Sequence, residues 1–245
     1  MSSARRSPVE EVAADVFFAR GRDVNWVLLR DGRDVTLVDT GYPGYLDDVL
    51  ASIAAIGCAP QHVAAILLTH AHVDHVGGVH HFVRQFGTPV YTDATEARHA
   101  RREFLEQAAP LDVARNLRRP GMVPWLRRVV PAGVAKKVTV ASAEAFPTEL
   151  DLPGRPVPVP TRGHTSGHVA YHLPAARAVI TGDELVTGHA LLAHDGPAVL
   201  PAFFGHGDSR AALATVAALD ADLVLPGHGA ALRVPVAEAV EQALR

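Results

Sequence analysis

The stretch Thr69-His70-Ala71-His72-Val73-Asp74-His75 carries four strong metal-binding side chains within six consecutive positions. It follows directly after the apolar segment 64–68, which predicts a buried strand that ends in a metal-binding loop. Histidines two positions apart in an extended loop can turn toward one point. The Asp74-His75 pair can turn toward a second point, so the motif suits two metal ions.

Four further motifs contain the same kinds of side chain. Asp39 follows the apolar run 35–38, and the other three motifs are Gly163-His164-Thr165-Ser166-Gly167-His168, Ala178-Val179-Ile180-Thr181-Gly182-Asp183 and Pro226-Gly227-His228-Gly229. The pattern His-x-His-x-Asp-His, followed by these motifs in this order, resembles the signature of the metallo-β-lactamase fold superfamily. A lone histidine cluster has an alternative interpretation as surface or tag-like sequence, and the four additional matches argue against it.

The resemblance implies an α/β fold, an αβ/βα four-layer sandwich whose two similar halves hold the metal site at one edge. We expect a single domain over residues 1–245. Strands are predicted at 24–29, 34–38, 64–68, 89–91, 156–160, 169–173, 178–180 and 223–225, and helices at 45–53, 77–86, 210–219 and 236–244. Asp31-Gly32 predicts a hairpin between the first two strands. The prolines in 156–160 predict an edge strand, because proline cannot donate to a ladder.

The resemblance also implies a division of the ligands between two divalent metal ions. One ion is expected to bind His70, His72 and His164, and the other Asp74, His75 and His228, with Asp183 bridging them. Asp39 and His168 are expected to support these ligands through hydrogen bonds without binding metal themselves. Imidazoles and carboxylates without thiolates favour zinc, and manganese, iron or cobalt accept the same donors.

Hydrolysis is the chemistry that such a site predicts. Two divalent ions carry more positive charge than the two predicted catalytic aspartates, Asp74 and Asp183, can neutralise. The surplus favours a metal-bound hydroxide as the nucleophile, since a metal lowers the pKa of bound water from 15.7 to about 7. Its expected target is the carbonyl of a thioester, lactone or other ester. No serine or cysteine nucleophile is required.

The composition is that of an ordinary soluble globular protein and excludes several other classes. Of 245 residues, 48% are hydrophobic and 20% charged, and the formal net charge of -3 predicts no attraction to nucleic acid or to an anionic membrane. Cys58 is the only cysteine, which rules out an intramolecular disulfide and a thiolate zinc cluster. The start of the chain, residues 1–8, lacks the apolar core of a signal peptide, so we expect a cytoplasmic location.

Residues 98–137 differ from the rest of the chain in charge. They contain ten basic and three acidic side chains, a net charge of +7. Within them, Met122, Trp125, Leu126, Val129 and Val130 have helical spacing, which predicts an amphipathic helix with Arg127 and Arg128 on its outer side. The resemblance implies a helical insertion near the active-site mouth. It is predicted to be a lid or docking surface for an anionic substrate, such as a carboxylate, a coenzyme A thioester or an acyl carrier protein; the alternative is a solvated helical face.

The substrate is less well determined by the sequence. Residues 163–168 resemble the corresponding stretch of glyoxalase II enzymes, but residues 184–192 lack the Gly-Cys-Gly element of those enzymes. Only one short helix is predicted after His228, so the glutathione-binding C-terminal helices of those enzymes are not expected and glutathione is not the favoured partner. The alternatives are a persulfide dioxygenase-like enzyme with one iron, and a non-catalytic binding protein on the same fold.

A few residues are candidates for contact with a small-molecule or acyl-carrier substrate. They are Trp125, Arg127 and Arg128 in the basic segment and His189 in the glycine-containing stretch after Asp183. Histidines elsewhere are expected to be ordinary surface or packing residues, namely His62, His80, His81, His99 and His172. The sequence does not determine the oligomeric state.

Overall fold

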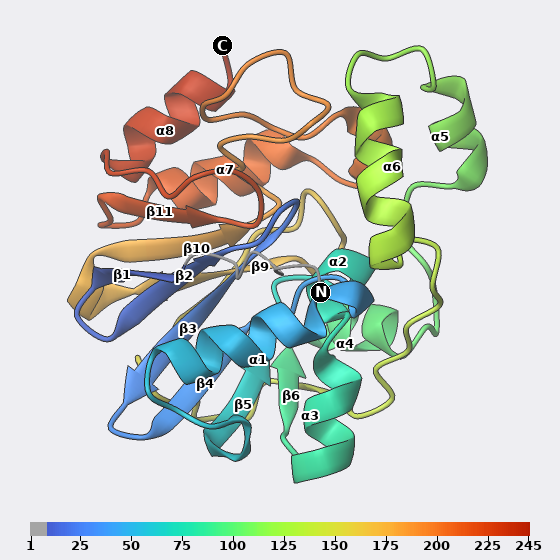
Figure 1. Ribbon diagram of the computed structural model, residues 1–245. Helices are drawn as coiled ribbons and strands as arrows, with labels where there is room; N and C mark the ends of the chain where they lie inside the picture. Colours follow the sequence, from blue (N-terminus) through green and yellow to red (C-terminus); the bar gives the residue numbers. More distant parts are fainter. Residues whose placement is uncertain (1–8) are drawn as a thin grey trace.

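The computed structural model describes residues 9–245, so the expectation for residues 1–8 lies outside the described part of the chain. The described residues form two β-sheets, drawn as neighbouring layers of arrows in Figure 1. One is a seven-stranded sheet in sequence order, formed by β1 (Val9–Ala13), β2 (Val16–Arg20), β3 (Asn25–Asp31), β4 (Asp34–Val38), β5 (Val63–Leu67), β6 (Val90–Thr92) and β7 (Ala143–Ala145). The other is a four-stranded sheet in the order β11 (Leu223–Pro226), β10 (Ala178–Gly182), β9 (Val169–Leu173) and β8 (Val157–Pro160).

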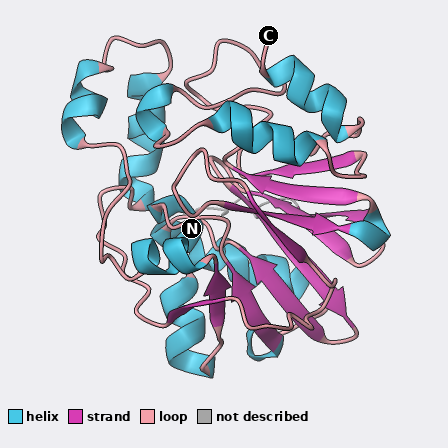
Figure 2. Cartoon of the chain, turned by 180° about the vertical axis from the view of Figure 1, so that it is seen from behind, coloured by secondary structure: helices cyan, strands magenta, loops and turns pink. Residues whose placement is uncertain are grey.

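Helices cover the outer faces of both sheets, as Figure 2 shows from behind. They are α1 (Leu46–Ala55), α2 (Val73–Val76), α3 (Val79–Phe86), α4 (Ala94–Ala100), α5 (Pro110–Arg115), α6 (Met122–Ala132), α7 (Ser209–Ala217) and α8 (Val236–Ala243). Short 3₁₀ turns occur at Pro43–Tyr45, Pro60–His62, Pro174–Ala176 and Ala202–Phe204. None of the described helices has the length and apolarity needed to cross a membrane.

Three hydrophobic cores separate four layers. Between the sheets, side chains such as Phe18 and Leu67 pack against Tyr171 and Leu225. A second core joins the outer face of the larger sheet to α1 and α3, and a third joins the smaller sheet to α7 and α8. Each sheet is buried on both faces, which explains its nearly continuous apolar strands. The predicted four-layer αβ/βα sandwich is therefore confirmed.

Several local predictions match the structure. β3 and β4 are antiparallel and joined through Gly32, whose φ of 59° suits the predicted hairpin turn. β8 lies at the edge of its sheet, as its prolines predicted. The sequence interpretation missed the hairpin of β1 and β2, which turns at Asp15 with a φ of 58°, and the three-residue strand β7. These segments are short and lack the glycine or proline turn signals that identified the others.

The basic segment lies between β6 and β7 and includes α5 and α6, which stand beside the sandwich at the right of Figure 1. α6 is bounded by Gly121 and Gly133, both with left-handed backbone conformations. The predicted apolar face needs one correction, because Val130 is 56% exposed. Arg128, expected on the outer side, is instead partly buried against Asp23, with a distance of 2.7 Å from its Nε to an oxygen of that carboxylate.

Candidate metal centre

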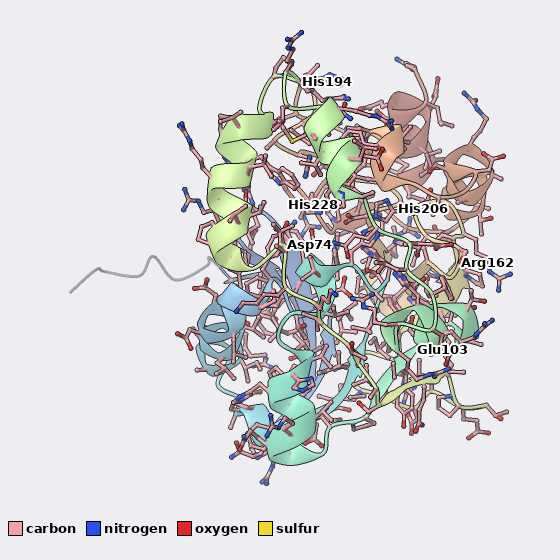
Figure 3. All side chains as sticks on the ribbon, turned by 90° about the vertical axis from the view of Figure 1, so that its right-hand side faces the viewer. Asp74, Glu103, Arg162, His194, His206 and His228 are labelled. Carbon is pink, nitrogen blue, oxygen red and sulfur yellow. The ribbon has the colours of Figure 1, made fainter. Side chains whose placement is uncertain are left out.

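The loops at one end of the two sheets deliver all seven predicted ligands to one place. His70 and His72 follow β5, Asp74 and His75 lie in α2, and His164 precedes β9. Asp183 follows β10 and His228 follows β11. In Figure 3, Asp74 and His228 lie near each other below the segment with α5 and α6, and His194 lies away from them at the top of the view.

Donor atoms of these residues converge in three overlapping groups. The groups are His70 with His72 and His164, His70 with His75 and Asp183, and Asp74 with His75 and His228; in each, the donor atoms lie within 4.8 Å of one another. Asp183 reaches toward both sides of the cluster, because its Oδ1 is 3.3 Å from Nε2 of His75 and its Oδ2 is 3.6 Å from Nε2 of His164. Two of the three groups coincide with the two ligand sets that the resemblance implied, and the assignment of these residues to metal ions stays a prediction.

Asp39 orients two of the clustered imidazoles. Its Oδ2 accepts hydrogen bonds from Nδ1 of His75 at 2.8 Å and from the Thr69 hydroxyl at 2.7 Å, and its Oδ1 accepts from the Thr69 amide at 2.9 Å. The Thr69 oxygen in turn accepts from Nδ1 of His70 at 3.1 Å. Asp39 itself lies outside the three groups of donors, and its hydrogen bonds leave Nε2 of both histidines directed into the cluster.

Backbone carbonyls orient two further histidines. Nε2 of His72 donates to the carbonyl of Glu106 at 2.7 Å, so its Nδ1 faces Nε2 of His164 at 3.0 Å. Nδ1 of His228 donates to the carbonyl of Asp23 at 2.5 Å, which leaves Nε2 of His228 toward the cluster. These contacts select one tautomer for each ring. The sequence interpretation missed both carbonyls, since a backbone acceptor has no sequence signature.

The donor set fits divalent cations. Nε2 of His70, Nε2 of His75 and Oδ1 of Asp183 are buried without a hydrogen-bond partner, a state that buried polar atoms rarely occupy in proteins. Burial lowers the pKa of His70 and His164 well below the usual value and that of His72 to about 4, so these rings are neutral and have a free lone pair. Burial alone would raise the pKa of Asp183, but His228 and His75 hold it well below its ordinary value.

Glu96 is a buried carboxylate that the sequence interpretation missed. It lies in α4 and joins the two loops that carry His72 and His164. Its Oε1 accepts from the Ala71 amide and from Nδ1 of His99, and its Oε2 accepts from the Thr165 hydroxyl, each at 2.7 Å. Burial opposes its ionisation, but these hydrogen bonds lower its pKa below the ordinary value. His99 is thus a packing residue, as expected, but one whose ring is fully buried against a carboxylate.

Two more polar residues hold the loops around Asp183. Nε2 of His168 accepts from the Asp183 amide at 3.3 Å, while its Nδ1 donates to the Thr161 hydroxyl at 2.8 Å. His168 was expected to support His164, but its hydrogen bonds hold the loops of Thr161 and Asp183. Glu184, which sequence reasoning missed, accepts from the His164 amide at 2.7 Å, and burial raises its pKa to about 7.

A pocket opens onto the donor cluster. Beside the cluster, its walls consist of Tyr42, Val73, Gln107, Ala108, Val113, Trp125, Val134, His189, Leu200 and Phe204. Trp125 and His189, two predicted substrate residues, therefore face it. Burial lowers the pKa of His189 to about 3, which keeps this ring neutral. Arg127 is exposed and outside the pocket, and Arg128 lines a neighbouring polar cavity.

Comparisons with known proteins agree with this geometry. The family model described as "Metallo-beta-lactamase superfamily" matches residues 19–228. The chain is 28% identical over 159 residues to the probable metallo-hydrolase YybB of Bacillus subtilis (strain 168), a match covering 65% of this chain and 60% of that protein. It is 31% identical over 133 residues to a hydroxyacylglutathione hydrolase of Jannaschia sp. (strain CCS1), covering 54% of this chain and 38% of that enzyme.

Solved structures show the same fold. MEM-A1, a subclass B3 metallo-beta-lactamase isolated from a soil metagenome library, superimposes with a TM-score of 0.66 at 20% identity, covering 97% of this chain and 94% of that one. At such identity the likeness concerns the fold alone. The family model, by contrast, spans most of the chain, including every residue of the donor cluster. The chain therefore belongs to the metallo-beta-lactamase superfamily.

Proposed function

We propose that this protein is a dinuclear metal-dependent hydrolase that cleaves a thioester, lactone or other ester. The observation that carries the proposal is the convergence of seven donor residues, with Asp183 directed toward two groups of histidines. His70, His72 and His164 would hold one ion, Asp74, His75 and His228 the other, and Asp183 would bridge them. Zinc is the proposed metal, because all donors are imidazoles and carboxylates.

Two divalent ions in these positions would lower the pKa of a bound water and polarise the scissile carbonyl. The protein's own part is to hold the ligands in one arrangement and to exclude bulk water. Asp39 and the carbonyls of Glu106 and Asp23 fix three of the imidazole rings. Trp125 and Phe204 cover one side of the pocket, with ring centroids 5.9 Å apart. A substrate between these walls would be oriented before reaction.

Thioester cleavage is favoured within this class by the relatives named hydroxyacylglutathione hydrolase. The matches cover less than half of those enzymes, so glutathione itself is not proposed as the substrate. A small-molecule or acyl-carrier substrate remains the prediction. A persulfide dioxygenase-like enzyme would differ in containing one iron and consuming oxygen.

Elemental analysis combined with hydrolysis assays tests the proposal. The purified protein is expected to hold two zinc ions and to cleave members of a panel of thioesters, lactones and simple esters, with the activity lost in a chelator and restored by zinc. His72→Ala should abolish both properties, whereas the exposed His80→Ala should retain them. One bound iron with oxygen uptake, or metal-independent cleavage, would contradict the proposal.

A further inference from the structure

An aromatic and aliphatic wall faces the donor cluster across the pocket. The Trp125 ring lies 5.9 Å from that of Phe204 and 5.8 Å from that of His189, measured between centroids. His189 in turn lies 5.0 Å from the ring of His228, so the apolar wall begins next to the donor cluster. Leu200 extends the same wall. A substrate whose scissile bond is at the cluster therefore has its adjoining groups against apolar surface.

The cationic side chains of the basic segment do not line this pocket. No lysine or arginine is found among the described residues that line it. Arg119 donates to the Leu191 carbonyl at 3.2 Å, and Arg128 is paired with Asp23 at 2.7 Å. Asp74 and Asp183, the carboxylates of the lining, belong to the donor cluster. An anionic group against the apolar wall would lose hydration without gaining a cationic partner.

We propose that this pocket selects substrates with a neutral, apolar acyl group of short to medium length. The inference rests on the proposed hydrolase function and names its substrate class. It replaces the expectation that the net charge of residues 98–137 selects an anionic substrate. What this segment contributes to the pocket is instead its uncharged side chains, including Val113, Trp125 and Val134.

A series of thioesters with one leaving group tests this preference in the zinc-loaded protein. From acetyl to hexanoyl, kcat/KM is expected to rise about tenfold or more, because each methylene buried in an apolar pocket contributes to transition-state binding. Replacing the terminal methyl of a butyryl group by a carboxylate, as in succinyl, should lower kcat/KM by about tenfold or more. Equal or better cleavage of the succinyl thioester would overturn the inference.

A charge placed in the wall provides a matched pair of variants. Val134 is half-buried at the pocket, whereas Val130 is exposed on α6. Val134→Lys supplies a cation in the pocket. It should therefore raise the ratio of kcat/KM for the succinyl thioester to kcat/KM for the butyryl thioester about tenfold relative to the unaltered protein. Val130→Lys adds the same charge outside the pocket and should leave the ratio unchanged. An equal change in both variants would point to long-range steering instead.

Direct binding separates this inference from the hydrolase proposal. Trp125 lines the pocket, so its fluorescence should change when a compound binds there. The variant Trp125→Phe retains only the signal of Trp26 and therefore shows how much of the change comes from Trp125. Hexanamide, a neutral compound that is not an ester, is expected to bind at least tenfold more tightly than succinamate. Tighter binding of hexanamide together with no ester hydrolysis would reject the hydrolase proposal and leave the apolar acyl pocket standing. The reverse order would reject the apolar acyl pocket.

Discussion

The side chain of Glu96 accepts a hydrogen bond from the amide of Ala71 at 2.7 Å, at the position between His70 and His72. The same carboxylate also accepts from Thr165, the neighbour of His164. Glu96 is fully buried, so it ties two ligand-bearing loops together without touching the cluster. We interpret it as a positioning residue for His70, His72 and His164.

Glu96→Gln should therefore weaken metal binding more than its small change in shape suggests. Glutamine keeps one acceptor oxygen, so its amide nitrogen must face either the donors of Ala71 and His99 or the Thr165 hydroxyl, and each buried donor left unpaired costs about 1–3 kcal/mol. We expect a lower free energy of unfolding and a 10- to 100-fold loss of zinc affinity, measured by competition with a chromophoric chelator. Glu103→Gln is the control, because Glu103 is 43% exposed in its ion pairs and should show little change.

Asp39→Asn tests whether the carboxylate of Asp39 sets the tautomer of His75. Asparagine tolerates the left-handed backbone at this position, where φ is 61°, so the fold should be retained. It accepts fewer hydrogen bonds than the aspartate, which holds Thr69 and His75. Zinc affinity is expected to fall about 10- to 100-fold, with a circular dichroism spectrum like that of the unaltered protein. Unchanged zinc affinity would argue against the assigned role.

Arg128 and Arg127 are expected to behave differently although they are adjacent. Arg128→Met removes the cationic partner of Asp23 and leaves the Tyr45 hydroxyl bonded to it; the Asp23 side chain is only 3% exposed and its carbonyl accepts from His228. We expect a loss of about 1–3 kcal/mol in unfolding free energy and an equal fall in kcat/KM for neutral and anionic thioesters. Arg127→Met should change neither. A selective rise in KM for anionic substrates in Arg128→Met would instead restore its predicted role in substrate binding.

Metal removal should lower thermal stability. The unpartnered donor atoms of His70, His75 and Asp183 would be satisfied only in the metal-bound protein. A ligand at 100 times its dissociation constant stabilises the folded state by about 2.7 kcal/mol, or about 5–10 °C in Tm for a chain of this size. Thermal unfolding with a chelator and then with added zinc measures the shift. No shift, or the same shift in His72→Ala, would mean that zinc does not bind this cluster.

Gly167 should not tolerate a side chain. A Cβ added there would lie 2.3 Å from the backbone nitrogen of Glu96, so α4 and the loop of His164 would have to separate. Gly167→Ala is expected to cost about 1–3 kcal/mol of unfolding free energy and to weaken zinc binding. Gly205→Ala, where the nearest atom would be 3.9 Å away, is the control in the same thermal unfolding measurements.

The residues of the donor cluster were predictable because each lies in a short motif beside an apolar strand. The strand 64–68 leads into His70 and His72, and the run ending at residue 182 leads into Asp183. Periodicity and motif order therefore identified the two halves, the sheets and the edge at which the ligands meet. The residues that orient the donor cluster were only partly predictable. Asp39 and His168 were identified because they belong to the motifs themselves, and Glu96 was not, because it lies outside them.

The sequence by itself determined the α/β fold, the metal-binding chemistry and the superfamily, because these depend on local patterns of a few residues. The cytoplasmic location and the number of metal ions stay predictions. Only the tertiary structure decided what surrounds the ligands. The contact of His228 with the Asp23 carbonyl spans 205 positions, and that of Arg128 with Asp23 spans 105. No local pattern encodes such contacts, since they arise only when the cores pack and bring distant loops together. For the same reason the basic segment was predicted from its charge, while packing left its apolar side chains facing the pocket.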